Sequence, residues 1–115
     1  MAKSEGRGAP CGTGMLLLAL LERRDMYGYE MVEALRAQSK EIFHLKAGTL
    51  YPLLHTLEAQ GWVKAYEKAA ENGKKRRYYR ITSAGKKQLT AERRQWEEFT
   101  GSVEKVIGGG ARAFA

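Results

Sequence analysis

A β-hairpin lies between helical segments and limits the fold more than any other feature of this sequence. Residues 62–68 and 75–81 are rich in β-branched and aromatic side chains, which favour strands. Asn72-Gly73 between them is the strongest short-range hairpin signal, because both residues tolerate positive φ angles. The loop is longer than two residues and leads into four consecutive cations, Lys74 to Arg77. We therefore expect a hairpin with a basic tip.

Two helices are predicted at the start of the folded region. The first begins with Thr13 as its cap and ends near Arg24. Its middle is apolar on all sides, which indicates burial against several neighbours and, in so small a domain, a partner subunit on one face. The second extends from Tyr27 to about Gln38 and carries an apolar stripe at helical spacing, formed by Gly28, Met31, Val32 and Leu35.

A third helix is predicted from about Ala47 to Gln60, before Gly61, a residue typical of helix ends. Proline near the first turn is compatible with a helix. At 100° per residue, one face gathers Leu50, Leu53, Leu54 and Leu57. The opposite face has no acidic residue and consists of Gly48, Tyr51, Pro52, His55, Thr56 and Ala59.

The last predicted helix is capped by Thr82 or Ser83 and ends near Ile107. A helix of ~25 residues is ~37 Å long, which exceeds what so small a core can cover. Its apolar side chains recur close to the spacing of a coiled-coil seam, at Leu89, Trp96, Phe99, Val103 and Ile107. We therefore expect a second copy of the chain along this seam, related by two-fold symmetry.

The charge is concentrated in one segment. The chain has 20 Lys and Arg against 13 Asp and Glu, a net charge of +7. Residues 64–94 alone hold eleven basic and three acidic residues, a net of +8. Such a local surplus predicts a polyanion-binding surface, most simply for nucleic acid. The alternative is a solvated basic face that only aids solubility.

Other classes of protein are not expected. The longest apolar run, residues 15–21, has seven residues, whereas a bilayer span needs about 20, so we expect a cytoplasmic protein without a membrane partner. The single cysteine, Cys11, fits a reducing compartment and has no partner for a redox switch. With two histidines and one aspartate, the chain shows no metal-ligand spacing or catalytic set. We expect no enzyme and no cofactor.

Three helices, a hairpin with a basic tip and a further helix form the order of a winged helix-turn-helix, in which the third helix enters the major groove of DNA. We predict a mainly α (α+β) fold of this type with a long C-terminal dimerisation helix. Its parts are a flexible N-terminal arm (1–12), the winged helix-turn-helix DNA-binding domain (13–81), the dimerisation helix (82–107) and a disordered tail (108–115).

Three motifs in this order resemble PadR-type transcriptional regulators. They are Tyr27-Gly28-Tyr29-Glu30-Met31, the stretch from Gly48 to Gly61 (GTLYPLLHTLEAQG), and the stretch from Arg76 to Gly85 (RRYYRITSAG). The resemblance covers residues 13–107. Ser83-Ala84 departs from the family, which usually has acidic residues there; this removes a favourable helix-dipole contribution of ~0.5 kcal/mol.

The resemblance implies a dimeric bacterial repressor that binds palindromic double-stranded operators and dimerises through its C-terminal helix. Many such proteins respond to small aromatic or lipophilic effectors. In some short members, which like this chain have one C-terminal helix, a tryptophan lines a pocket at the dimer interface and stacks on flat ligands. Trp96 occupies a matching place.

We expect DNA contacts from the third helix, its flanks and the hairpin tip, at Tyr29, Lys46, Thr49, Tyr51, Pro52, His55, Thr56, Lys74, Lys75 and Arg76. Tyr51 and Tyr29 could instead orient the helix through partly buried hydroxyls, and Arg77 could be structural. Expected ligand contacts are Met15, Ala19, Leu89, Trp96 and Phe99, although Trp96 could simply pack in the dimer core. Expected dimer contacts are Leu16, Leu20, Leu89, Trp96, Phe99, Val103 and Ile107.

Two other functions remain open from the sequence. A winged-helix protein-interaction module would bind DNA weakly and pair its basic wing with an acidic protein. A non-specific nucleic-acid binder would ignore base sequence and lose its affinity as salt increases.

Overall fold

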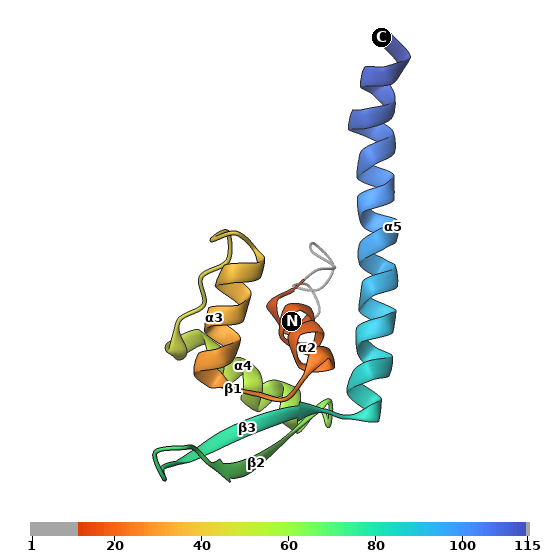
Figure 1. Cartoon of the computed structure of the whole chain (residues 1–115). Coiled ribbons are helices and arrows are strands. Elements are labelled where there is room, and N and C mark those ends of the chain that lie inside the picture. The colour runs from red at the N-terminus through yellow and green to blue at the C-terminus, as the bar shows by residue number, and fades with distance from the viewer. Residues whose placement is uncertain (1–11, 115) are drawn as a thin grey trace.

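The computed structural model describes the backbone of residues 12–114 and the side chains of residues 12–108. The elements follow in the order α2 (Thr13–Arg23), β1 (Met26–Tyr27), α3 (Gly28–Gln38), α4 (Ala47–Ala59), β2 (Val63–Ala69), β3 (Lys75–Ile81) and α5 (Ser83–Phe114). Helices α2, α3 and α4 lie on one side of an antiparallel sheet with strand order β1-β3-β2, and α5 extends out of this body (Figure 1). The predicted winged helix-turn-helix is confirmed.

Helix α2 lies at the centre of the core. It contacts α3, α4, α5 and β3, and its residues Leu17, Leu18 and Leu21 are almost completely buried. These neighbours within one chain account for the all-round apolar character of α2, so the partner subunit inferred from that pattern is not needed to explain it. Gly12, rather than Thr13, occupies the position before the helix, and Thr13 is its first residue. The predicted Thr13 cap is therefore wrong.

Strand β1 was not predicted, because two residues are too few to show an alternating pattern. Met26 pairs with Tyr79, and Tyr27 with Tyr78. Helix α3 consequently begins at Gly28, one residue later than expected. A side-chain oxygen of Glu30 accepts the backbone N–H of Tyr27, the residue just before α3, at 3.2 Å. This N–H has no hydrogen-bond partner within the helix itself. The pairing of β1 with β3, the central strand, fixes the start of α3 beside the sheet.

The hairpin has the predicted strands, with β2 shifted one residue toward the tip. Its register extends from Val63 opposite Ile81 to Ala69 opposite Lys75. At the tip Gly73 has a positive φ, of 85°, whereas Asn72 does not. The reason is the longer loop, which closes through an Ala70 N–H to Lys74 O bond of 2.7 Å. The Asn72 side chain instead accepts the Lys74 backbone N–H at 3.0 Å.

Helix α5 begins after Thr82, one of the two predicted caps. The Thr82 hydroxyl accepts the Gly85 N–H at 3.0 Å and donates to the Gly61 carbonyl at 2.6 Å. The helix continues to Phe114 rather than ending near residue 107, so residues 108–114 of the predicted disordered tail are helical. Glycines weaken a helix but do not forbid it, and this segment has no proline. Residues 1–11 of the predicted N-terminal arm, with Cys11, lie outside the described residues.

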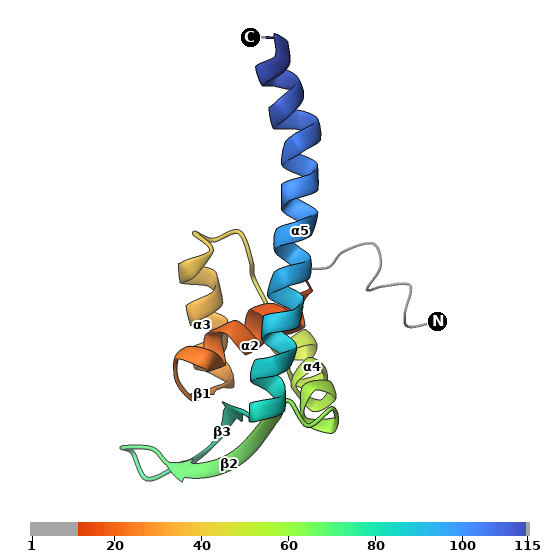
Figure 2. The same ribbon diagram turned by 90° about the vertical axis from the view of Figure 1, so that its right-hand side faces the viewer.

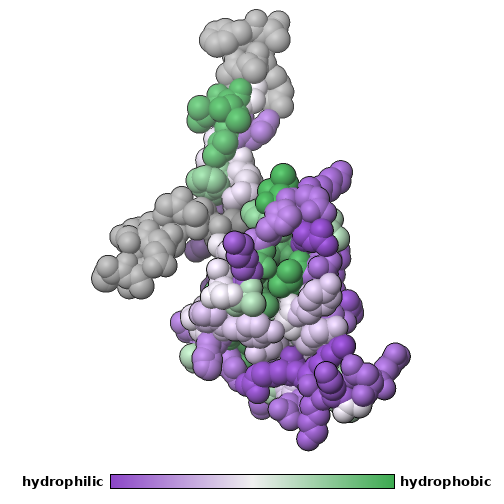
Figure 3. All heavy atoms as spheres, turned by 90° about the vertical axis from the view of Figure 1, so that its left-hand side faces the viewer, coloured by the Kyte–Doolittle hydropathy of each residue, from purple (hydrophilic) through white to green (hydrophobic). Residues whose placement is uncertain are grey.

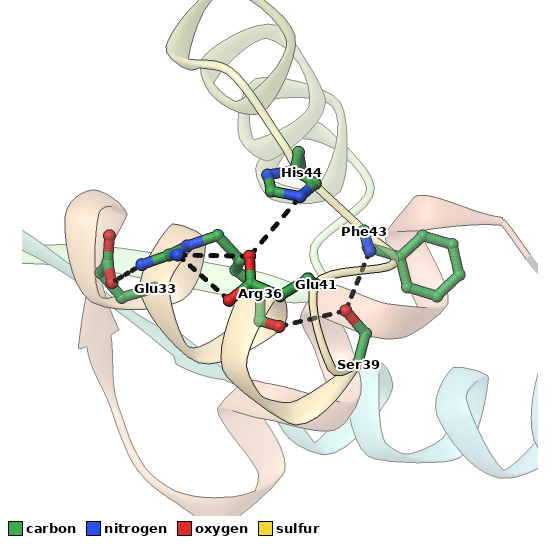
Figure 4. Close-up of polar contacts among 6 residues, drawn as sticks. All are labelled: Glu33, Arg36, Ser39, Glu41, Phe43 and His44. Carbon is green, nitrogen blue, oxygen red and sulfur yellow. Dashed lines mark hydrogen bonds and ion pairs between the residues drawn. The ribbon is translucent and has the colours of Figure 1, made fainter.

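A polar network shapes the connection between α3 and α4 (Figure 4). The guanidinium of Arg36 contacts Glu33 at 2.6 Å and Glu41 at 3.2 Å, and the hydrogen bond and charge of Glu33, followed by Glu41, raise the pKa of Arg36. The His44 imidazole lies 3.7 Å from Glu41. This connection reverses the chain at Lys40 and Glu41, which have positive φ angles of 54° and 71°.

Candidate nucleic-acid interface

Helix α4 separates its side chains into the two predicted faces. Leu50, Leu54 and Leu57 are buried, and Leu53 is half-buried. The residues of the predicted outward face are all exposed: Gly48, Tyr51, Pro52, His55, Thr56 and Ala59. Lys46 and Thr49 are also exposed at the start of the helix. The leucine face anchors α4 in the core, and the outward face presents hydroxyl and imidazole groups, which can contact phosphate oxygens and base edges, without a carboxylate that would repel phosphates.

The two tyrosines of the α3–α4 pair have different surroundings. Tyr29 is 63% exposed. Tyr51 is 49% exposed, and its ring lies against the backbone of Gly28, so close that a Cβ there would overlap the Tyr51 hydroxyl. Tyr51 therefore positions the start of α4 against the start of α3, which is the alternative role considered from the sequence, and still offers half of its surface to a partner.

The four cations after the hairpin tip have different surroundings, because successive residues of a strand point to opposite faces of the sheet. Lys74 and Lys75 are exposed. The Arg76 guanidinium lies 4.4 Å from the centre of the Tyr27 ring. Arg77 contacts Glu58 of α4 at 3.3 Å, and its contacts with Tyr79 and then with Glu58 raise its pKa. Arg77 thus joins the wing to α4, in agreement with the structural role considered for it.

The residues expected at a ligand pocket and a dimer interface do not all lie at the surface. Met15, Leu20 and Leu89 are 8%, 4% and 1% exposed, because α2 and the first turns of α5 pack on each other inside one chain. Leu20 still lines the groove described below, and the expected contacts of these three residues with a ligand or a partner stay predictions. Trp96 stacks on Phe99 with a centroid distance of 5.9 Å. The two rings are 36% and 41% exposed, and Val103 and Ile107 are exposed as well.

A groove of about 400 Å³ lies between α2, α3, α5 and the connection before α4. Leu16 and Ala19 line it, together with Leu35, Phe43 and Arg93, but Trp96 is not among its lining residues. The expected neighbours Trp96 and Ala19 therefore do not both line this groove. Figure 3 shows hydrophilic side chains over the wing and hydrophobic ones on the protruding part of α5.

Three cations of the sheet, Lys64, Lys68 and Arg80, were not singled out from the sequence. The signal was present, because alternate residues of a strand share one face and Lys68 lies opposite Arg76. Within the described part of the chain, no group of three His, Cys, Asp or Glu side chains could hold a metal ion. No helix there combines the length and apolar character needed to cross a bilayer.

The fold and this surface have known counterparts. The model of the transcriptional regulator PadR-like family matches residues 17–91, more than half of the chain. The chain belongs to this family. The predicted membership is confirmed, and the matched range contains all three motifs in full.

Individual similar proteins, all described as transcriptional regulators, agree with this membership. A protein named Transcriptional regulator Rv3488 from Mycobacterium tuberculosis is 41% identical over 71 residues, which are 62% of this chain and 63% of that protein. The solved structure of a transcriptional regulator from Clostridium thermocellum is 35% identical, with a TM-score of 0.70 over 84% of this chain and 89% of that one. A PadR family transcriptional regulator from Eggerthella lenta is 33% identical, with a TM-score of 0.72 over 93% and 88% of the two chains.

Proposed function

We propose that this PadR-family regulator is a cytoplasmic homodimer that binds a specific double-stranded operator and represses transcription until a small aromatic or lipophilic ligand releases it. The observation that carries the proposal is the outward face of α4, whose residues are all exposed and include no carboxylate, next to a wing that ends in exposed Lys74 and Lys75. Both belong to one packed domain, because α4 contacts β2 and Arg77 of β3 contacts Glu58 of α4.

In this proposal α4 contacts the bases and the wing contacts the sugar-phosphate backbone. Helix α4 enters the major groove, where His55 and Thr56 reach base edges, while Tyr51 both positions the helix and contacts DNA. Lys74, Lys75 and Arg76 lie along the sugar-phosphate backbone and displace counterions. Pro52 fits the groove surface, and the flanking phosphate contacts come from Tyr29, Lys46 and Thr49.

The dimer supplies the second recognition helix. Helix α5 leaves the body with Trp96, Phe99, Val103 and Ile107 exposed on one side, and a second copy along this seam would cover them. Leu16, half-buried beside the groove, completes the proposed interface. Two α4 helices about 34 Å apart would then enter successive major grooves on one side of the duplex.

The ligand would act at the same seam. The stacked rings of Trp96 and Phe99 leave part of their faces exposed, and Ala19 lies at the nearby groove. A flat apolar molecule between two copies of this ring pair would release DNA if it bound better to a dimer with a different α4 separation. A ligand shifts such an equilibrium only by the difference in its affinity for the two states.

The DNA part is tested with the region upstream of the protein's own gene and a shuffled duplex of equal composition. Lys74→Ala with Lys75→Ala should weaken binding to both duplexes and lower the salt slope by about 1 per cation. His55→Ala with Thr56→Val should reduce the preference for the upstream region and leave the salt slope unchanged. Equal losses on both duplexes for both variants would point to a non-specific binder instead.

The ligand part is tested by titrating planar aromatic compounds while tryptophan fluorescence is recorded. Trp62 contributes a constant background, so the Trp96→Ala variant is the control. Quenching that disappears in this variant, together with release of DNA at the same ligand concentration, supports the proposal. Quenching that persists in the variant removes Trp96 from the site.

A further inference from the structure

The face of the sheet that points away from the helices carries cations at both ends and tyrosines in the middle. In the register of β2 and β3, Lys64 lies opposite Arg80, Tyr66 opposite Tyr78, and Lys68 opposite Arg76. Alternate residues of a strand share a face, and the other face contains the buried Val63, Tyr79 and Ile81. We call these six residues, with Tyr27 of β1 opposite Tyr78, the outward sheet face.

The pairing of like charges on this face is unfavourable for the isolated chain. Like charges directly opposite each other destabilise a strand pair, and the outward sheet face has two such pairs, Lys64 with Arg80 and Lys68 with Arg76. The inward face is different, because there Arg77 lies opposite Glu67 and also contacts Glu58. On the inward sheet face, which packs on the helices, carboxylates therefore balance the charge of Arg77. On the outward sheet face the positive charge is in excess.

The aromatic rings partly compensate the cations. Arg76 lies over Tyr27, Lys68 over Tyr78 at 5.2 Å, and Arg80 over Tyr66 at 5.7 Å. Tyr66 stacks on Tyr78 with a centroid distance of 5.8 Å. Such contacts hold the cationic groups in place along the strand pair, but they add no negative charge.

Carboxylates near this face are few in the described part of the chain. The Tyr66 hydroxyl donates to Asp25 at 2.5 Å, and this bond, followed by desolvation, raises the pKa of Tyr66. Glu71 lines a hollow of about 450 Å³ near the tip with Lys68, Arg76 and Tyr78. Glu30, beside Tyr27, is paired with Arg24 at 3.5 Å, so Asp25 and Glu71 against the four cations of the face leave a net positive surface.

We propose that the outward sheet face binds the sugar-phosphate backbone of the operator duplex, outside the groove that α4 enters. The inference rests on the proposed function and extends the DNA contacts from the hairpin tip along the whole strand pair to Lys64 and Arg80. Charge complementarity favours a polyanion. The sheet is rigidly joined to α4 through the Arg77–Glu58 pair and through Thr82, which binds the Gly61 carbonyl after α4.

A duplex fits this face better than a single strand. Single strands are usually bound by stacking their bases on exposed aromatic rings. Here the three rings contact one another and are covered by Arg76, Lys68 and Arg80. The cations thus face outward, in the arrangement that suits phosphates rather than bases.

The decisive variant is Lys64→Glu. It places an opposite charge across from Arg80, so the melting temperature should rise or stay unchanged, while affinity for duplex DNA should fall. A face that only aids solubility would gain stability without losing affinity, and a merely structural Lys64 would lose stability. Either of these results would overturn the proposal.

Salt dependence provides the second measurement, by fluorescence anisotropy with a mixed-sequence duplex of about 40 bp, four helical turns. Lys64→Ala with Arg80→Ala should lower the salt slope by about 2, that is, about 1 per cation. The matched control is Arg94→Ala with Lys105→Ala, which removes the same charges from α5. At 100° per residue, these lie about 160° and 180° from Trp96, opposite the apolar seam, and the slope should not change.

The results separate this inference from the proposed function. If the unchanged protein fails to bind duplex DNA, the proposed function itself fails. If it binds and the Lys64, Arg80 variant keeps the full slope, only the outward sheet face is excluded. Tighter binding of the corresponding single strand, lost in the same variant, would also overturn the proposal in favour of base stacking.

Discussion

Gly28 and Gly85 lie where any side chain would collide with a neighbouring element. A Cβ at Gly28 would overlap the Tyr51 hydroxyl of α4, and one at Gly85 would overlap the backbone carbonyl of Trp62. In both cases the missing side chain lets two elements approach each other closely, α3 with α4 and α5 with the start of β2. Gly28 thus sets the position of the helix that we propose to enter DNA.

Gly28→Ala is expected to destabilise the fold by about 1–3 kcal/mol, the usual cost of overpacking, and to weaken DNA binding because Tyr51 and the start of α4 must move. Gly101→Ala is the matched control. It lies within α5 with nothing near its Cβ position, so it should stabilise by up to about 1 kcal/mol. Urea denaturation measures both. Equal stabilities of the two variants would contradict the close packing of Tyr51 on Gly28.

Among the elements, the connection between α3 and α4 contains the least favourable backbone. Lys40 and Glu41 both have left-handed φ angles, which cost non-glycine residues about 1–2 kcal/mol each. The contacts of the Glu41 carboxylate with Arg36 and His44 offset part of this cost. Phe43 is fixed by a 2.9 Å bond from its N–H to the Ser39 hydroxyl. The turn determines how α4 leaves α3, so its conformation affects the presentation of the DNA-binding face.

Lys40→Gly is expected to stabilise the protein by about 0.5–1 kcal/mol, because glycine adopts the left-handed conformation without strain but loses more entropy on folding. Ala37→Gly, three residues earlier and exposed within α3, should instead destabilise by about 1 kcal/mol. Thermal unfolding of the two variants side by side measures the difference. A loss of stability in Lys40→Gly would show that the Lys40 side chain contributes to the turn.

At the scale of the whole molecule, the shape is elongated because one helix extends well beyond the folded body. The chain measures 62 × 30 × 24 Å, and its long dimension is due to α5, which extends beyond the other helices in both views (Figures 1 and 2). Arg93 joins α5 to Glu22 of α2 at 3.3 Å, and Leu89 is buried nearby on the same helix. Beyond these residues, Val103, Val106 and Ile107 are exposed, which is costly for a chain on its own.

Val103→Asp is expected to convert the proposed dimer into single chains at micromolar concentration, because it buries a charge in the apolar seam. Gly101→Asp is the control. It introduces the same charge about 140° from Trp96 on the helix, away from the seam, and should leave the dimer intact. Sedimentation velocity distinguishes the two. If the unchanged protein sediments only as single chains, with and without operator DNA, the paired arrangement of α4 helices is wrong.

Local patterns determined much of this structure. The leucine face of α4, the strands around the wing tip and the Thr82 cap all follow from spacing and side-chain chemistry within a few residues. The three motifs, in the same order along the chain, were sufficient to indicate the PadR family. These features depend on interactions between near neighbours in the sequence, so they can be read without knowing the fold.

Contacts between distant segments required the tertiary structure. Strand β1 forms only because Met26 and Tyr27 pair with β3, which follows some fifty residues later in the chain. Leu20 and Leu89 appear equally apolar in the sequence to Phe99 and Val103, and only the packing of α2 on α5 shows that the first two are buried. The balance of charge on the sheet likewise depends on register, because a shift of one residue would exchange its two faces. The sequence by itself therefore determined the elements and the family, whereas burial and strand pairing decided which side chains remain free for DNA or for a second copy.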